Sequence, residues 1–586
     1  MKKYLISAYI IGIMFGGLQA QVVDTAYFQL NYVPHLLNFE KISTPATITD
    51  TAQEKVTFDY YITPQKVDVT FSPTPIKATK IAPEPMKRLY RNFIKVGFGY
   101  PLTPLAELSI HNGSNKKNSF GLNIHHFSSW AQPIGKTMKQ YTYYPTSDTK
   151  SEFFFSRFFK KQTLYSSIGY NHQSARYYGF KIAETPLPTY YSGDLYEDSL
   201  KTHFHHVRAE IGLRSNYNLD ERALKQDVRI NYDGIFTRHH DMENHIGLTS
   251  FFAYDARWLK ISGSQLYRLN LNFDYYNNKY GPIGDSLLPS SHALLFNPEI
   301  YAHWTFNEYH ILVGLGTAIG SKTNQEKVDF AIYPLGEVQL GLIRGILSIY
   351  AGVNGNLVYN SYEKLLYENP FIKPQFTDTR YTKNWIHVYG GIKGNLVKKL
   401  NYNIFAEYTY AQNMLFYVQD TLALLRNQFD VVYDDGGYLH VGLNMNWEVM
   451  NQLHLALDAD YWLYHLDNLE KPWYKPSLEF GFSGKYFFKD FLVFNANFDL
   501  GFGRWAWALD QETSTTYEAQ LMKPILDFGI GAEWLINKQF TAFLNVHNIA
   551  GQYYAKYYDY RSFGINVLAG ITYSFGEQSL KKSKKR

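Results

Sequence analysis

Hydrophobic and polar residues alternate along most of the chain. In residues 227–236 (DVRINYDGIF) the even positions are mostly apolar and the odd positions are mostly polar. Residues 267–275 (YRLNLNFDY), 453–463 (LHLALDADYWL) and 492–502 (LVFNANFDLGF) repeat this alternation. A period of two residues predicts a β-strand with one apolar and one polar face. Runs of about ten residues that alternate in this way, separated by turn residues, are typical of transmembrane β-barrels.

We count about 22 such runs between residues 92 and 575, with an uncertainty of about two. The connections after even-numbered runs are tight and lie near residues 160–162, 343–344, 397–399, 450–451, 489–490 and 537–538. Many connections after odd-numbered runs are long and lie near residues 130–149, 177–202, 279–291, 359–382, 417–429 and 507–519. Barrels of the bacterial outer membrane have short periplasmic turns and longer extracellular loops. We therefore predict an all-β protein, a transmembrane antiparallel barrel of about 22 strands, with both termini in the periplasm.

The N-terminus predicts export. Lys2 and Lys3 precede an apolar stretch over residues 4–15, and residues 18–20 (LQA) end in a small residue. This pattern indicates a signal peptide over residues 1–20, because the apolar stretch is short of the roughly 20 residues of a spanning helix. The stretch that follows contains four prolines in residues 72–85 (SPTPIKATKIAPEP), which favour extended backbone.

These features divide the chain into four parts. We predict a signal peptide over residues 1–20, an extended Pro-rich segment over 21–90 that is periplasmic or lumenal, a barrel over 91–575 and a basic periplasmic tail over 576–586.

Composition adds to this interpretation. The chain has no cysteine, so it holds neither a disulfide nor a lipid-modified cysteine. Aromatic residues make up 17% of the sequence, which suits the aromatic girdles of a membrane barrel. The formal net charge of +5 is small for a chain of 586 residues, so we predict no nucleic-acid partner.

The polar faces of the predicted strands carry charges of both signs. The candidates for lumen-facing charged residues are Arg208, Glu210, Arg229, Asp233, Arg268, Asp274, Glu407 and Asp458. One interpretation is a hydrated or mutually paired interior, which is normal for barrels. The other is a solute path, or a docking site for the N-terminal segment.

One histidine-rich stretch raises the question of a metal. Residues 238–245 (RHHDMENH) place His239, His240, Asp241 and His245 at a predicted outer loop. Such side chains can bind transition metals, but the polar composition of a loop explains them equally well. We predict no metal site and no cofactor here, and the sequence offers no Ser, His and acid constellation that indicates an enzyme.

The last strand carries a further pattern. Gly570, Tyr573 and Phe575 resemble the C-terminal signal that the outer-membrane assembly machinery reads, which is a glycine, a hydrophobic residue three positions later and a terminal aromatic. The strand over residues 565–575 must also close the barrel against the strand near residues 92–100.

Two segments resemble a known family. Residues 543–575 contain an NVHNI run, a tyrosine-rich loop and a GxxYxF end, and they resemble the closing hairpin of TonB-dependent-receptor-like barrels. Residues 73–129 resemble the opening of a plugless group of such proteins in Bacteroidetes. The resemblance implies an outer-membrane barrel, but residues 21–90 are too few for the globular plug of a true receptor. Residues 44–50 (TPATITD) only faintly resemble the energy-coupling segment, and an exposed Thr-rich linker explains them better.

Two functions fit these observations. The first is solute transport or uptake across the outer membrane by a receptor-like or porin-like barrel. The second is a non-transporting barrel subunit of an envelope assembly or secretion complex. The expected partners are outer-membrane lipid, the barrel assembly machinery and, for the second function, envelope proteins.

Overall fold

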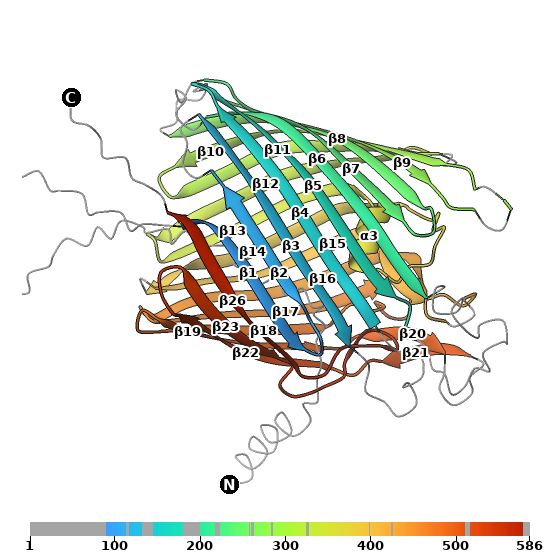
Figure 1. Cartoon of the computed structure of the whole chain (residues 1–586). Coiled ribbons are helices and arrows are strands. Elements are labelled where there is room, and N and C mark those ends of the chain that lie inside the picture. Colours follow the sequence, from blue (N-terminus) through green and yellow to red (C-terminus); the bar gives the residue numbers. More distant parts are fainter. Residues whose placement is uncertain are drawn as a thin grey trace, which may run out of the picture. The chain divides into compact units, whose positions relative to one another are not determined.

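The structure is a computed structural model (Figure 1). It describes residues 90–112, 117–131, 144–179, 200–216, 223–256, 258, 263–282, 285–286, 288–323, 327–397, 399–423, 426–509 and 516–577. The predicted signal peptide, the Pro-rich segment apart from Tyr90, and the basic tail after Glu577 lie outside the described residues.

Within the described residues, one antiparallel sheet of 22 strands closes on itself (Figure 1). Its strands are β1 (Tyr90–Tyr100), β2 (Leu105–His111), β3 (Asn118–Ala131), β4 (Tyr144–Phe158), β5 (Gln162–Arg176), β6 (Lys201–Ser215), β7 (Lys225–Thr237), β8 (Met242–Asp255), β9 (Ser264–Lys279), β10 (Ser291–Phe306), β11 (Tyr309–Lys322), β12 (Asp329–Ile343), β13 (Leu347–Tyr359), β14 (Tyr381–Val397), β15 (Leu400–Gln419), β16 (Phe429–Met450), β17 (Leu453–Leu466), β18 (Leu478–Phe488), β19 (Leu492–Phe502), β22 (Ile525–Leu535), β23 (Phe540–His547) and β26 (Asn566–Glu577). The predicted all-β barrel and its strand number are confirmed. No helix in this part of the chain is long and apolar enough to cross a membrane.

The first and last strands form the seam of the barrel. β1 and β26 pair antiparallel, with Ile94 opposite Tyr573 and Gly97 opposite Gly570. A closed ring has no free sheet edge, so the backbone N–H and C=O groups of the strands pair with one another, as the apolar interior of a membrane requires. Phe543 of β23 packs closely over the glycine pair. A Cβ on Gly570 would lie only 2.5 Å from the Phe543 Cζ.

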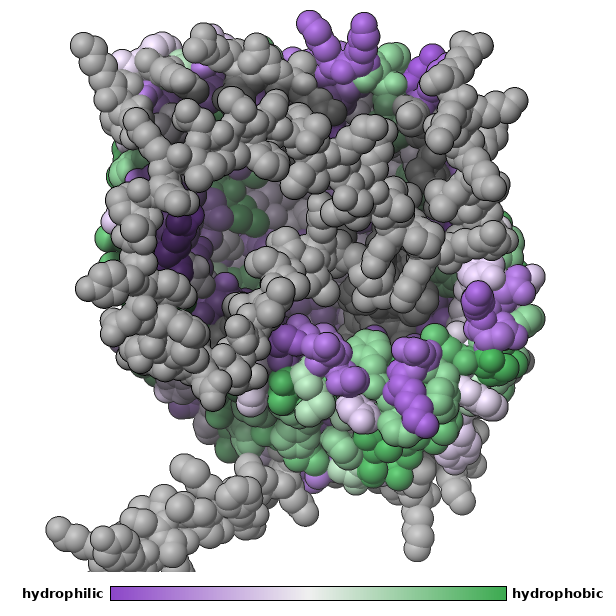
Figure 2. Space-filling model, turned by 90° about the vertical axis from the view of Figure 1, so that its left-hand side faces the viewer, coloured by the Kyte–Doolittle hydropathy of each residue, from purple (hydrophilic) through white to green (hydrophobic). Residues whose placement is uncertain are grey.

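The outward face of the strands is apolar. Phe98 is 68% exposed, and Ile168 and Ile300 are each 62% exposed, at positions that alternate with less exposed inward residues. Figure 2 shows hydrophobic residues gathered on an outer flank of the molecule and hydrophilic residues along its rim. Large apolar side chains exposed in such numbers need an apolar solvent, so this is the surface of a membrane barrel.

The two ends of the barrel differ as the sequence predicts. The tight turns include residues 307–308, 344–346, 451–452 and 489–491, and all of them lie at one end. The long connections lie at the other end, and three of them contain structure that the alternating pattern did not predict. These are helix α3 (Tyr362–Glu368), the hairpin β20 (Trp505–Leu509) with β21 (Tyr517–Leu521), and the short pair β24 (Ala555–Tyr557) with β25 (Tyr560–Arg561).

Candidate functional site: the loop-filled end of the barrel

Helix α3 folds into the barrel at the end with the long loops. Tyr367 of α3 contacts His206 of β6, where the Tyr367 hydroxyl lies 2.7 Å from His206 Nδ1. The Tyr417 hydroxyl of β15 donates to the carbonyl of Leu365 in the same helix, at 3.5 Å. β6 and β15 are separated by eight strands of the sheet, so a helix that reaches both lies inside the ring (Figure 1).

Acidic side chains on the barrel wall hold this loop in place. Glu243 of β8 is 1% exposed and accepts hydrogen bonds from the backbone N–H groups of Tyr362 (2.9 Å) and Glu363 (3.0 Å). Ser361 caps the helix from within its own loop and accepts from the N–H of Lys364 at 3.2 Å. The first N–H groups of a helix have no partner within the helix, so these bonds satisfy donors that would otherwise be buried and unpaired.

Asp241 joins three loops at the same place. Its carboxylate accepts from the N–H of Gly281 at 2.9 Å, from the N–H of Gln375 at 3.0 Å and from the Tyr362 hydroxyl at 3.3 Å. The turn after β7, the loop after β9 and the loop after β13 are therefore fixed to one another. A carboxylate that accepts several backbone N–H bonds is a strong anchor, because each bond to a charged acceptor is stronger than a neutral one.

The loops also share a hydrophobic core. Its buried members, which we call the loop core, are Phe204, Ile235, Tyr362, Leu365, Leu366, Ile372, Phe376, Ala411, Met414, Phe416, Tyr417, Phe429, Val431, Trp473, Tyr474, Ala506, Ala508, Met522, Tyr557 and Tyr560. Phe371 and Tyr560 stack with their ring centroids 3.8 Å apart, which joins the loop after β13 to the loop after β23. Lys475 and Glu368 form an ion pair of 2.8 Å at its edge. The long loops thus form a small packed domain inside one end of the barrel.

Ionisable groups in these loops respond to burial. Burial raises the pKa of Glu363 above its usual value, since the carboxylate loses water. Burial alone would also raise the pKa of Glu368, but the charge and hydrogen bond of Lys475, together with Lys364 and Tyr417, outweigh it and lower that pKa. Burial lowers the pKa of Arg504 to about 10, and its guanidinium donates to the carbonyls of Ala555 and Lys556.

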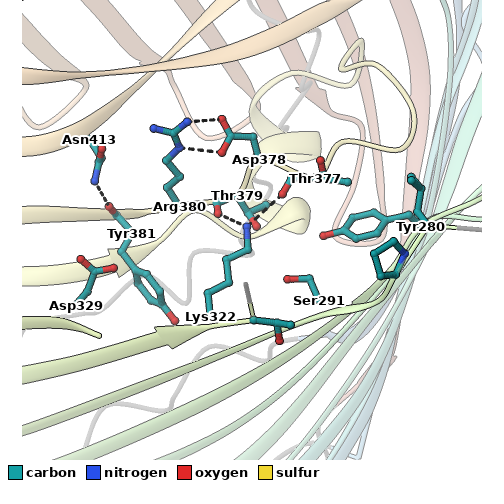
Figure 3. A pocket seen from close by; sticks show the side chains of 13 residues that line it. Tyr280, Ser291, Lys322, Asp329, Thr377, Asp378, Thr379, Arg380, Tyr381 and Asn413 are labelled. Carbon is teal, nitrogen blue, oxygen red and sulfur yellow. Dashed lines mark hydrogen bonds and ion pairs between the residues drawn. The ribbon is translucent and has the colours of Figure 1, made fainter. Parts of the chain in front are cut away.

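A pocket of about 510 Å³ opens beside the loop after β13 (Figure 3). Lys322 lies in it and donates to the carbonyls of Thr377 (3.1 Å) and Thr379 (2.6 Å). Arg380 forms two hydrogen bonds of 2.8 Å each with Asp378. The cations of the pocket already have partners, so its lining is polar without being strongly charged.

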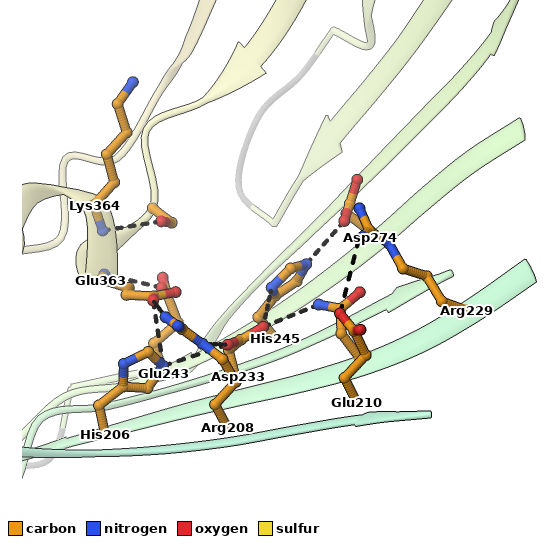
Figure 4. A network of polar contacts seen from close by, with 12 residues as sticks. His206, Arg208, Glu210, Arg229, Asp233, Glu243, His245, Asp274, Glu363 and Lys364 are labelled. Atoms are coloured by element: carbon orange, nitrogen blue, oxygen red, sulfur yellow. Dashed lines mark hydrogen bonds and ion pairs between the residues drawn. The ribbon is translucent and has the colours of Figure 1, made fainter. Parts of the chain in front are cut away.

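Seven of the eight charged residues predicted from the sequence fall into two groups on the inward face, and Figure 4 shows the first of them. In the first group, Arg208 donates to Asp233 at 2.8 Å, and Arg229 lies 3.8 Å from Glu210. His245 joins this group to Asp274, at 2.9 Å.

The second group lies on strands β14 to β17. Glu407 contacts His440 at 2.7 Å, and Asp458 accepts from Asn444 at 2.8 Å. Arg268 lies outside both groups, over the rings of Phe251 and Tyr301. These contacts are those of a paired polar wall, while a solute path along them stays a prediction.

The histidine-rich stretch is split by the structure. His239, His240 and Asp241 lie in the turn between β7 and β8, whereas His245 lies on β8 and faces Asp233 and Asp274. Among the described residues, the group whose ligand atoms all lie within 4.8 Å of one another is instead His206, Asp233 and Glu363.

Sequence reasoning missed three of the groups that matter here. His206 and Glu243 alternate in phase with the inward charges of β6 and β8, so the period of two could have identified both. Glu363 lies in a long loop, where no periodicity indicates which residues fold inward.

The barrel is similar in fold to bacterial receptors of known structure. It is similar to the FrpB iron transporter from Neisseria meningitidis, with a TM-score of 0.61 and 11% identity, over 84% of this chain and 82% of that one. It is also similar to the ferripyoverdine receptor of the outer membrane of Pseudomonas aeruginosa (TM-score 0.61, 10% identity, 83% of this chain and 72% of that one). The siderophore receptor PirA from Acinetobacter baumannii gives a TM-score of 0.61 at 9% identity, over 83% of this chain and 80% of that one.

No family model and no curated protein matches the sequence. At such low identity the structural likeness shows the fold alone. It agrees with the barrel that the resemblance to TonB-dependent-receptor-like proteins implies, whereas membership of the plugless group stays a prediction.

Proposed function

We propose that the chain is an outer-membrane protein that takes up a hydrophilic solute through its barrel, and that the loop core closes the lumen between transport events. The observation that carries this proposal is the packed domain of long loops inside one end of a barrel with a polar wall. A barrel of this size would leave an open channel if nothing filled it. The loop core supplies a closure made from the barrel's own loops.

Two further observations support uptake. The pocket beside Lys322 offers hydroxyl, amide and paired charged groups to a polar solute, in a part of the molecule built from long loops. Proteins named as an iron transporter and as siderophore receptors have a similar fold. The chemical identity of the solute does not follow from either observation, and we propose only a hydrophilic one.

Conductance in planar lipid bilayers tests the closure. The intact protein is expected to give little or no steady current. A variant in which residues 361–379 are replaced by a Gly/Ser linker of equal length is expected to give a much larger current, because it loses α3 and its anchors. We also expect residues 21–85 to narrow the lumen. Their deletion is a second comparison and is expected to raise the current. Replacing the tight turn 344–346 by a linker is the matched control and is expected to leave the current unchanged.

The second candidate function is a non-transporting subunit of an envelope assembly. The observation in its favour is that the loop core is apolar, aromatic and hydrogen-bonded like the core of a stable domain. If the linker variant folds as a barrel but stays closed to current and to L-arabinose in a liposome-swelling assay, the uptake proposal is contradicted and the assembly function gains support. Large permanent currents from the intact protein would contradict closure itself.

A further inference from the structure

Helix α3 meets the barrel wall at a cluster of ligand-type side chains (Figure 4). Glu363 of α3 faces His206 of β6 and Asp233 of β7. His206 Nε2 lies 3.2 Å from Glu363 Oε1 and 3.4 Å from Asp233 Oδ1. The three ligand atoms all lie within 4.8 Å of one another. Three separate elements thus bring one nitrogen and two carboxylate oxygens to a common point.

His206 is held rigidly and points its other nitrogen into the cluster. The side chain is 2% exposed, and its Nε2 makes no hydrogen bond although two carboxylates are close. Its Nδ1 lies 2.7 Å from the Tyr367 hydroxyl, which in turn accepts from Asn171 at 2.9 Å. Histidines that bind metals usually make one hydrogen bond through the ring nitrogen that does not bind the metal. This bond fixes the ring and leaves the other nitrogen for the cation.

The charges of the cluster favour a cation. Asp233 and Glu363 each carry a negative charge when ionised, and Arg208 contacts both, at 2.8 Å and 3.6 Å. His245 Nδ1 also lies 3.5 Å from the second oxygen of Asp233. Two carboxylates that share a partly buried site repel each other, and a cation between them relieves that repulsion.

We propose that His206, Asp233 and Glu363 bind one divalent transition-metal ion, with zinc as the best fit, and that this ion fastens α3 to the barrel wall. Zinc bonds to histidine nitrogen and carboxylate oxygen are about 2.0–2.2 Å long, which places two ligand atoms of a tetrahedron about 3.3–3.6 Å apart. The distances of 3.2 Å and 3.4 Å from His206 Nε2 are close to this spacing. A mixed set of imidazole and carboxylate suits zinc better than magnesium or calcium, which prefer oxygen alone.

Arg208 competes with the metal for the same oxygens. Its Nε donates to Asp233 Oδ1, and its Nη2 lies nearest to Glu363 Oε1. The Arg208 side chain is 57% exposed, so it can turn away into the lumen, whereas His206 is enclosed. Removing Arg208 is therefore expected to strengthen metal binding. An ion-pair network without a metal site predicts no such gain.

Calorimetric titration of the full-length protein in detergent, stripped with EDTA, with zinc chloride tests the proposal. We expect one zinc ion per chain, confirmed by elemental analysis. H206Q and E363Q are expected to lose more affinity than the roughly 10–100-fold that removal of an outer-shell partner costs. R208Q is expected to bind zinc several-fold more tightly. H205Q is the matched control, and its affinity for zinc is expected to be unchanged. His205 immediately precedes His206 on β6 and faces the opposite side, where its ring packs against His172.

A second measurement follows the fastening itself. Zinc is expected to slow protease cleavage within residues 361–379 of the wild type and to have no effect in E363Q. The heat-dependent gel shift of a folded barrel checks each variant, and E363Q in the loop keeps the test valid if H206Q fails to fold. Zinc binding that H206Q and E363Q leave intact, binding that H205Q abolishes, or no stoichiometric binding at all would overturn the proposal.

Discussion

Gly570 shows how strongly single positions constrain the seam. Its inward side has no room for a side chain, since a Cβ there would lie 2.1 Å from the carbonyl oxygen of Val96 and 2.5 Å from Phe543 Cζ. Phe543 also carries the Lys95 ammonium over its ring, at 4.7 Å. The glycine of the predicted assembly signal thus has a packing role in the finished barrel, whatever the assembly machinery reads.

Replacing Gly570 by alanine is expected to destabilise the barrel by about 1–3 kcal/mol, because the methyl group must displace backbone or the Phe543 ring. Gly169→Ala is the matched control, since a Cβ there meets its nearest neighbours at ordinary distances of 3.6 Å and 3.8 Å. The measurement is the guanidinium concentration at which half of the protein has lost its heat-dependent gel shift. Equal midpoints for the two variants would show that the close approach at the seam does not matter.

Among elements, the strands were predictable and the loop core was not. The alternation in residues 227–236 or 492–502 depends on which side of one strand meets lipid, so it can be identified from the residues of that strand alone. Helix α3 has seven residues, and its stability comes from distant partners such as Glu243 and Tyr417. No periodicity in so short a segment indicates those partners. The inward charges of the strands could therefore be predicted individually. The proximity of Asp233 to Glu363 could not, because Glu363 lies in a loop without periodicity.

The ion pair between α3 and the loop after β17 gives the loop core a pH dependence. Burial alone would raise the pKa of Glu368, but the charge and hydrogen bond of Lys475, with smaller contributions from Lys364 and Tyr417, lower it below its usual 4.5. Because the pKa is lowered in the folded state, the pair stabilises the loop at pH values above the ordinary carboxylate pKa. This stabilisation is lost as the pH falls through the lowered pKa.

Amide hydrogen exchange of α3, compared between variants at each pH, tests this dependence. The wild type is expected to be better protected than K475Q near neutral pH, and the two are expected to converge as the medium becomes acidic and Glu368 is protonated. K471Q is the control, because Lys471 pairs with the exposed Glu470 at 3.7 Å and lies over the Trp505 ring at 4.8 Å, rather than beside Glu368. A difference between wild type and K475Q that persists unchanged in acid would contradict the role of this pair.

The molecule as a whole combines a locally specified barrel with a loop core assembled from distant loops. The apolar outer face fixes which surface meets the membrane, and the difference between tight turns and long loops makes its two ends unequal. The loop core then fills only the end that carries the long loops. If that end faces outward, the pocket beside Lys322 and the loop core both lie on the side of the external medium.

The chain's lack of cysteine allows this orientation to be tested directly. Leu422, between β15 and β16, is 88% exposed at the end with the long loops, and the Arg344 side chain is 94% exposed in the tight turn between β12 and β13. A membrane-impermeant maleimide is expected to label L422C in intact cells, and to label R344C only after the outer membrane is broken, because tight turns of such barrels face the periplasm. Both variants label in the purified protein, which controls for reactivity. Labelling of R344C but not L422C on intact cells would reverse the orientation and place the loop core on the periplasmic side.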